Sequence, residues 1–474
     1  MVCLRLPLSI EMRILTAEVK AQRAHGPMSA TPQPTPEDDG SFAYRLYDLA
    51  LGEEDARLCR DIPEAQCRAQ PSSFVLHTLS QALSKTGDAL SDSKVVLPWL
   101  LGAVGAPAFL VGFLVPIRES LALLPQILVG GVIRHFPVRK WFWTISSAIE
   151  GLCIVLMGAV ALLGIEGATA GWSIVGLLFV FSLARGVASI AAKDTLGKTV
   201  SKGQRGRVGG YASTASGAIA AAVGLYLVLS PEAARPEWLL YAMLIAAGVC
   251  WFLAAAAFAV IDEYPGATDG GRGIRDLIRD QVALLLQDPE LQKFLLARTL
   301  MIATALTGPV YVALAQRGTG ESLSGLGWLV VATGLAGAVS STFWGILSDR
   351  SSRSTMALAS GIAGLLGLAV VGALQIMPSL DSSILFFAAA LFVLSIAHAG
   401  VRIGRKTHIV DLAGGERKSE YVALSNTIIG VLLLAIGGLT GLLMAIGLEF
   451  ALAALSLAAL LGAALAMTMR NVQA

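Results

Sequence analysis

The stretch Trp344–Arg353, with the sequence WGILSDRSSR, decides the fold because it separates two long apolar runs. These runs cover residues 323–347 and 355–377. Each exceeds the roughly 18 apolar residues that are typical of a membrane-spanning helix. The stretch is therefore predicted to be a short basic connection at a membrane surface.

An earlier stretch, Gly131–Arg139, with the sequence GVIRHFPVR, is a degenerate copy of the first. A shift of 214 residues relates Gly131 to Gly345, Arg139 to Arg353, and Gly186 to Gly400. Past the next loop, Gly217 matches Gly430 with a shift of 213 residues. Because the apolar runs around both stretches match as well, we interpret the membrane part as one six-helix unit used twice.

The pattern G-x-x-x-D-R-x-x-R resembles the signature loop between the second and third helices of each half of major facilitator superfamily transporters. The second stretch matches it at Gly345, Asp349, Arg350 and Arg353. The first keeps Gly131 and Arg139, but His135 replaces the acid and Phe136 the arginine. The resemblance covers about residues 78–470. It implies an all-α integral membrane protein with twelve transmembrane helices in two halves, and a cytoplasmic gate at these loops. The gate of the first half is expected to be weak, absent or pH-sensitive through His135.

Composition agrees with a membrane protein and gives no indication of enzyme chemistry. The chain has 474 residues, of which 55% are hydrophobic and 14% charged, with a mean hydropathy of +0.70. It contains no phosphate-binding loop motif, and its histidines lack metal-ligand spacing. We therefore expect no catalytic residue, metal or cofactor, and no nucleic-acid partner. The five scattered cysteines are expected to be reduced thiols.

The repeat sets the expected domain boundaries. Residues 1–77 form a cytoplasmic N-terminal extension, disordered over 1–43, followed by the first half at 78–260. A cytoplasmic linker with an amphipathic helix occupies 261–291, and the second half 292–474. The shift places helix 1 at 78–102, although the obvious apolar run begins only at Val95. The other helices are expected at 106–135, 140–164, 171–195, 206–229, 237–260, 292–316, 322–347, 355–377, 383–408, 419–441 and 446–469.

The distribution of lysine and arginine gives the expected orientation. One side of the membrane collects fourteen of these residues, namely Arg134, Arg139, Lys140, Lys198, Lys202, Arg205, Arg207, Arg272, Arg275, Arg279, Arg350, Arg353, Arg417 and Lys418. The other side has only Arg235 and Arg317. Because cytoplasmic loops are the basic ones, both termini are predicted to be cytoplasmic, in an inner or plasma membrane.

Ionisable residues inside the expected helices are the candidates for a transport cavity and for coupling. They are Lys85, Asp88 and Asp92 on helix 1, Arg118 and Glu119 on helix 2, Glu150 on helix 3, Arg185 on helix 4, and His398 and Arg402 on helix 10. Lys85, Asp88 and Asp92 share one helical face. Structural ion pairs are the alternative role for the acids. Arg405, near a helix end, is interpreted as reaching the membrane interface.

Three functions are compatible with these residues. The first is a secondary transporter of a small solute, coupled to protons by a carboxylate that pairs with Arg118, with Asp92 the first choice and Asp88 and Glu119 the others. The second is a uniporter whose acids are structural. The third is a relative that no longer transports and serves in assembly or sensing through residues 1–77. More cations than anions lie on the candidate helix faces, which favours an anionic or zwitterionic solute.

Overall fold

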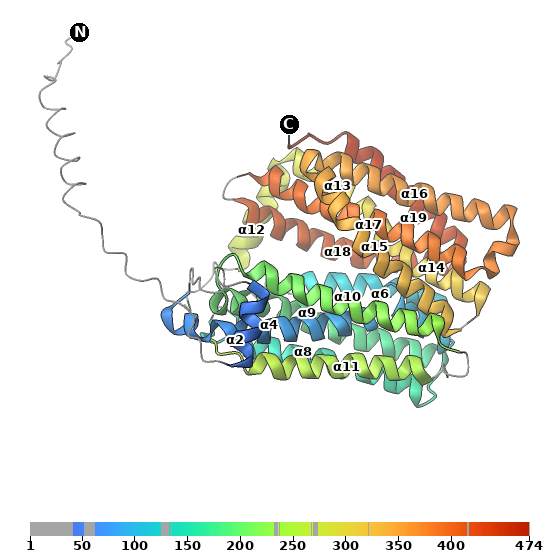
Figure 1. The fold of residues 1–474 in the computed structure, drawn as a ribbon. Coiled ribbons are helices and arrows are strands. Elements are labelled where there is room, and N and C mark those ends of the chain that lie inside the picture. The colour runs from blue at the N-terminus through green and yellow to red at the C-terminus, as the bar shows by residue number, and fades with distance from the viewer. Residues whose placement is uncertain are drawn as a thin grey trace, which may run out of the picture.

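The structure, a computed structural model, describes residues 41–51, 62–124, 132–133, 135–231, 236, 238–266, 268, 274–320, 322–414 and 417–473. Within these ranges the chain is helical and contains no strand. The helices run side by side in one bundle, in which the first half of the chain forms one block and the second half another (Figure 1).

The first block contains α4 (Glu64–Leu90), α5 (Val96–Ala103), η1 (Ala108–Leu110), α6 (Val111–Leu123), α8 (Lys140–Leu162), α9 (Gly167–Thr199), α10 (Arg205–Leu229) and α11 (Trp238–Ala259). A short helix, α2 (Phe42–Leu51), precedes it. After the linker helix α12 (Ile274–Gln287), the second block contains α13 (Pro289–Met301), α14 (Ala303–Thr319), α15 (Leu323–Arg350), α16 (Ser352–Ile376), η3 (Pro378–Ser382), α17 (Ile384–Ala413), α18 (Lys418–Ile446) and α19 (Leu448–Met467). Ten helical segments in the described ranges are long and apolar enough to cross a membrane. The pair α4–α5 and the helix α6 stand where the other two spans are expected.

The first expected helix differs from the prediction, because it is divided into α4 and α5. Asp92 stabilises the break: its Oδ1 accepts hydrogen bonds from the backbone N–H groups of Lys94 and Val95, at 2.8 and 3.0 Å. Such local side-chain bonds compete with helix continuation, and hydropathy does not detect them. The corresponding helix of the second half is also divided, at Ile302 between α13 and α14.

The N-terminal boundary at residue 77 is not a structural boundary, since α4 passes through it without interruption. The preceding helix α2 packs on the start of α10 through Tyr47, which is fully buried. The Tyr47 hydroxyl donates to Gln204 at 3.1 Å and accepts from Gln70 at 2.5 Å. Of the segment 1–43, which was expected to be disordered, residues 1–40 lie outside the described residues, whereas Phe42 begins α2.

One cysteine departs from the expected reduced state, because Cys67 near the start of α4 is disulfide-bonded. Its partner lies outside the described residues. Cys153 and Cys250, inside the bundle, are free thiols as expected.

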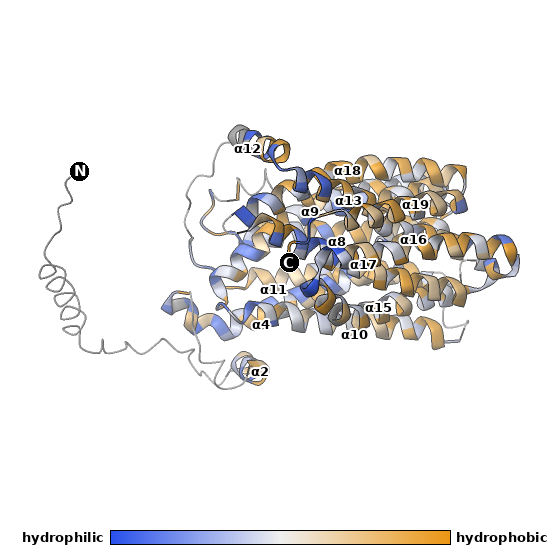
Figure 2. Ribbon diagram, turned by 90° about the horizontal axis from the view of Figure 1, so that it is seen from above, coloured by the Kyte–Doolittle hydropathy of each residue, from blue (hydrophilic) through white to orange (hydrophobic). Residues whose placement is uncertain are grey.

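The two halves pack closely at the end of the bundle that lies away from α2 and α12. A Cβ atom on Gly112 of α6 would lie 2.6 Å from Gly441 of α18, and one on Gly437 would lie 2.1 Å from Pro116. By contrast, a Cβ on Gly209 or Gly210 would meet no atom within 4 Å. Hydrophilic residues gather at the end that carries α2, α12 and the C-terminus (Figure 2). Close contact between the halves thus involves glycines at the more apolar end, whereas Gly209 and Gly210 do not serve helix packing in this conformation.

Candidate functional site

Four helices of the first half each contribute one charge to a group that we call the Asp88 cluster: Asp88 from α4, Arg118 from α6, Glu150 from α8 and Arg185 from α9. Arg118 donates to one oxygen of Asp88 at 2.5 Å, and Arg185 donates to the other. Arg185 also donates to Glu150 at 3.2 Å. Two carboxylates and two guanidinium groups make the cluster formally neutral.

Glu150 is the most buried member of the Asp88 cluster. The Glu150 side chain is fully buried, and its Oε1 has no hydrogen-bond partner among the described residues. Arg118 places its guanidinium 4.4 Å from the centre of the Phe181 ring, a cation–π contact. Asp88 and Glu150 share Arg185, so a proton added to one carboxylate changes what the other and both arginines bind. The cluster is therefore chemically capable of switching partners.

Lys85 lies beside this cluster but binds a different helix. Its Nζ donates to the carbonyl of Gly209 at 3.0 Å and to the Ser213 hydroxyl at 2.6 Å, both on α10. No carboxylate among the described residues lies within ion-pair distance of Lys85. It connects α4 to α10 through neutral groups.

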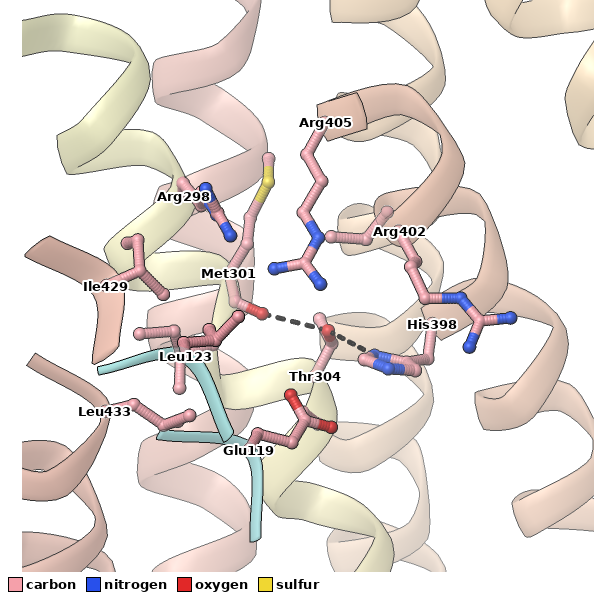
Figure 3. Close-up of a pocket in the computed structure, with 13 residues that line it drawn as sticks. Glu119, Leu123, Arg298, Met301, Thr304, His398, Arg402, Arg405, Ile429 and Leu433 are labelled. Carbon is pink, nitrogen blue, oxygen red and sulfur yellow. Dashed lines mark hydrogen bonds between the residues drawn. The ribbon is translucent and has the colours of Figure 1, made fainter. Parts of the chain in front are cut away.

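A second group of charges surrounds a pocket between the two halves (Figure 3). Glu119 and Leu123 of α6 line one side, and the second half supplies the rest, including Arg298, His398 and Arg405. The space open to water-sized groups is about 40 Å³. This is room for several water-sized groups, which is enough for the polar head group of a solute.

A chain of polar contacts crosses from one half to the other beside this pocket. Lys94 Nζ lies 3.1 Å from Glu119 Oε1 and 3.3 Å from His398 Nε2. Thr304 donates its hydroxyl proton to the carbonyl of Met301 at 2.9 Å, and its oxygen lies 3.1 Å from His398 Nδ1. The Thr304 oxygen therefore accepts from Nδ1–H of His398, and Nε2 accepts from the Lys94 ammonium. This arrangement requires a neutral His398.

Three arginines at the pocket have no carboxylate partner in the described part of the chain: Arg298, Arg402 and Arg405. Arg298 is only 8% exposed, and it donates to the Ser425 hydroxyl and, at 3.2 Å, to Asn426 Oδ1. Its Nε has no hydrogen-bond partner among the described residues. Figure 3 shows Arg298 and Arg405 pointing toward the same space from different helices, with Arg402 on the far side of His398. The pocket is therefore strongly cationic.

The structure separates the candidate residues into these two groups and leaves Lys85 and Asp92 outside both. Asp92 stabilises the break between α4 and α5 and does not pair with Arg118, whose partner is Asp88. Sequence reasoning missed Arg298, although an arginine inside an expected span was a visible signal. It also assigned Arg405 to the membrane interface, whereas Arg405 lines the pocket.

The two loop motifs behave opposite to expectation. The gate of the first half was expected to be weak, but there Arg139 pairs with Asp194. Lys198 also binds Asp194 at 3.1 Å and Glu263 at 2.7 Å. In the second half, Asp349 and Arg350 are exposed and form no ion pair with any described residue, and Arg353 donates to the Met469 carbonyl at 2.7 Å. Gly131 lies outside the described residues, His135 is exposed, and a Cβ on Gly345 would meet no atom within 4 Å.

Comparison with known proteins agrees with the architecture. Residues 294–473 match the model of the Major Facilitator Superfamily. No curated protein matches the chain by sequence. Similar solved structures include the nucleoside transporter NupG (11% identity, 84% of this chain, 98% of that chain, TM-score 0.61). They also include a D-xylose-proton symporter (11%, 85%, 98%, 0.60) and the peptide transporter POT in complex with sulfate (14%, 83%, 93%, 0.60). At these identities the likeness establishes the fold, so the expected all-α fold of two six-helix halves is confirmed.

Proposed function

We propose that this chain, a major facilitator superfamily protein by its C-terminal sequence and by its fold throughout, is a secondary transporter that moves a small solute across a membrane by alternating access. One observation carries the proposal. Charged residues of both halves, Glu119 from the first and Arg298 and Arg405 from the second, meet at a pocket between helices expected to lie in lipid. Charges in such a place are costly, and transport pathways are where membrane proteins retain them.

Packing between the halves supports alternating access. The glycine contacts at Gly112–Gly441 and Gly437–Pro116 hold the halves together at one end. At the other end, a Cβ atom on Gly209 or Gly210 would meet no atom of the described residues within 4 Å. Rocking of one half against the other would exchange these two arrangements around the pocket.

We assign proton coupling to Asp88. With Asp88 ionised, Arg118 and Arg185 both bind it, and Glu150 supplies the second negative charge of the cluster. Protonation of Asp88 would leave Arg185 to Glu150 and Arg118 without an anion. Arginine does not deprotonate, so Arg118 would need a new partner, and that need would tie protonation to movement of α6.

Two other functions compete with this one. In a uniporter the ion pairs of the Asp88 cluster would be permanent and structural, and transport would not depend on the proton gradient. In an assembly or sensory protein, loss of the pocket charges would leave function intact, whereas loss of the N-terminal extension would abolish it. The cationic pocket favours transport over assembly, because assembly gives no reason to keep unpaired arginines there.

The excess of lysine and arginine on one side of the expected helices supports an orientation with both termini in the cytoplasm, in an inner or plasma membrane. The disulfide at Cys67 is the one observation that opposes this orientation, because disulfides are rare in the cytoplasm. Labelling of single cysteines introduced at Glu166 and at Arg350 with an impermeant reagent in intact cells decides between the two. We expect label at residue 166 only, and label at residue 350 only would reverse the orientation.

Reconstitution tests the function itself. The purified full-length protein in liposomes is given a panel of sugars, amino acids, nucleosides and small carboxylates, with and without an imposed proton gradient. We expect uptake of at least one solute, and accumulation of that solute only with the gradient. Uptake that ignores the gradient would favour the uniporter, and no uptake or counterflow of any class would contradict the transporter.

A further inference from the structure

We propose that Arg298 and Arg405 form a binding site for an anionic group of the solute, a carboxylate or a phosphate. The inference rests on the proposed transport function for the movement of that solute, but the binding itself is independent of it. It names the chemical class that the pocket selects.

The partners of Arg298 provide the first argument. Arg139 is as buried as Arg298, at 8% exposure, and it binds Asp194. Arg118 and Arg185, which are partly exposed, bind the carboxylates of the Asp88 cluster. Arg298 is 8% exposed and has only the neutral Ser425 and Asn426 as partners. A buried guanidinium without an anion is costly, so the site is incomplete by itself.

The charge balance of the pocket provides the second argument. Three arginines line it, Arg298, Arg402 and Arg405, and the only carboxylate in the described lining is Glu119. Glu119 already binds Lys94 at 3.1 Å. Two guanidinium groups that point into one space, with no free acid beside them, repel one another until an anion enters.

The second half has no acid at the positions equivalent to the two acids of the Asp88 cluster. Adding 214 to Asp88 and to Glu150, the acids that neutralise the first cluster, gives Ile302 and Gly364. Subtracting 213 from Asn426 gives Ser213, which in the first half binds Lys85. Both halves thus hold a cation between corresponding helices by neutral groups, but only the first half has acids at the positions of Asp88 and Glu150.

Geometry indicates the kind of anion. Ser425 and Asn426 fix both Nη atoms of Arg298, and its Nε edge is left without a partner. Guanidinium edges match the two oxygens of a carboxylate or phosphate, and the available 40 Å³ suits such a head group. An anion between Arg298 and Arg405 would join α13 to α17 and face Glu119 of the first half.

Thermal denaturation of the full-length protein in a neutral, lipid-free detergent tests the site. The probes are succinate and inorganic phosphate, with choline chloride at equal ionic strength as the control. We expect succinate or phosphate, but not choline chloride, to raise the midpoint in a saturable way. Arg298→Gln and Arg405→Gln should each weaken binding and so raise the half-saturating anion concentration by about 10- to 100-fold. This is the effect of losing one charged hydrogen-bonding partner.

Two further variants keep the test decisive. Arg417→Gln removes a surface arginine, 59% exposed, and should leave the anion response unchanged. If Arg298→Gln fails to fold, Arg298→Lys replaces it. This variant keeps the positive charge but loses the paired N–H donors of the guanidinium, so it should still weaken anion binding.

Three results would overturn the inference: equal anion response in wild type and variants, no response to either anion, or stabilisation by phosphatidylglycerol but by neither soluble anion, which would assign the arginines to a lipid head group. If Arg298→Gln still transports a neutral solute, the anion site is contradicted but the transport function stands. If the protein binds anions but transports nothing, the transport function is contradicted but the anion site stands.

Discussion

Arg139 and Arg353 occupy equivalent positions in the two halves, 353 − 139 = 214 residues apart, yet only Arg139 binds a carboxylate. The reason lies on the fourth helix of each half. Asp194 on α9 is the partner of Arg139, and adding 214 gives His408 on α17. His408 contacts the Ser352 hydroxyl at 2.9 Å instead, and Arg353 turns to a backbone carbonyl.

This asymmetry predicts unequal effects of two matched substitutions. Asp194→Asn should destabilise the protein by about 3 kcal/mol, because it leaves a buried guanidinium without its anion. Asp349→Asn, at an exposed residue with no ion pair among the described residues, should change stability by less than about 0.5 kcal/mol. The thermal midpoints of the two variants in detergent measure the difference, and a larger loss for Asp349→Asn would contradict it.

The repeat made most of the helix positions predictable. A constant shift transferred the better-defined helices of the second half onto the first, and it located a helix upstream of Val95 that hydropathy alone would begin too late. It could not reveal the division at Asp92, because that break depends on two local hydrogen bonds from the backbone N–H groups of Lys94 and Val95 to the Asp92 side chain.

The candidate site was only partly predictable. Charges inside expected spans identified Asp88, Arg118, Glu150 and Arg185, but helical faces alone could not choose Asp88 over Asp92 as the partner of Arg118. Arg405 sits close enough to a helix end to look like an interfacial residue, and only tertiary packing turns it toward the pocket. The docking of α2 through Tyr47 involves a contact 157 residues away, which no local pattern signals.

Asp92 should behave as a structural residue, because it stabilises the break between α4 and α5. Asp92→Asn keeps a side-chain oxygen for the N–H groups of Lys94 and Val95, so transport and stability should stay near wild type. Asp92→Ala removes that acceptor and should cost about 1 kcal/mol, as the loss of a cap does. Transport per folded protein and thermal midpoint distinguish these, and loss of gradient-driven accumulation in Asp92→Asn would restore Asp92 as the coupling acid.

The N-terminal region should divide into a dispensable part and an integral part. Removal of residues 1–40 should leave folding and transport nearly unchanged, because their polar, proline-containing sequence cannot form a core. Tyr47→Ala should destabilise by about 3 kcal/mol, since it empties a fully buried aromatic site and removes the bonds to Gln70 and Gln204. Membrane-inserted yield and thermal midpoint are the readouts. Loss of inserted protein on removal of 1–40 would instead promote the sensory or assembly function.

Proton coupling through Asp88 is the central claim, and a comparison of accumulation with counterflow tests it most directly. Both are measured in liposomes for whichever solute the panel identifies, with wild type, Asp88→Asn and Asp381→Asn. Asp381 lies at the opposite end from α12, and its one ion-pair partner among the described residues is Arg317, which also binds Glu449. The amide of Asn mimics a protonated acid, so Asp88→Asn should lose gradient-driven accumulation and keep counterflow, while Asp381→Asn keeps both. Accumulation at the wild-type level by Asp88→Asn, at equal reconstituted protein, would contradict the claim and leave the Asp88 cluster a structural pair.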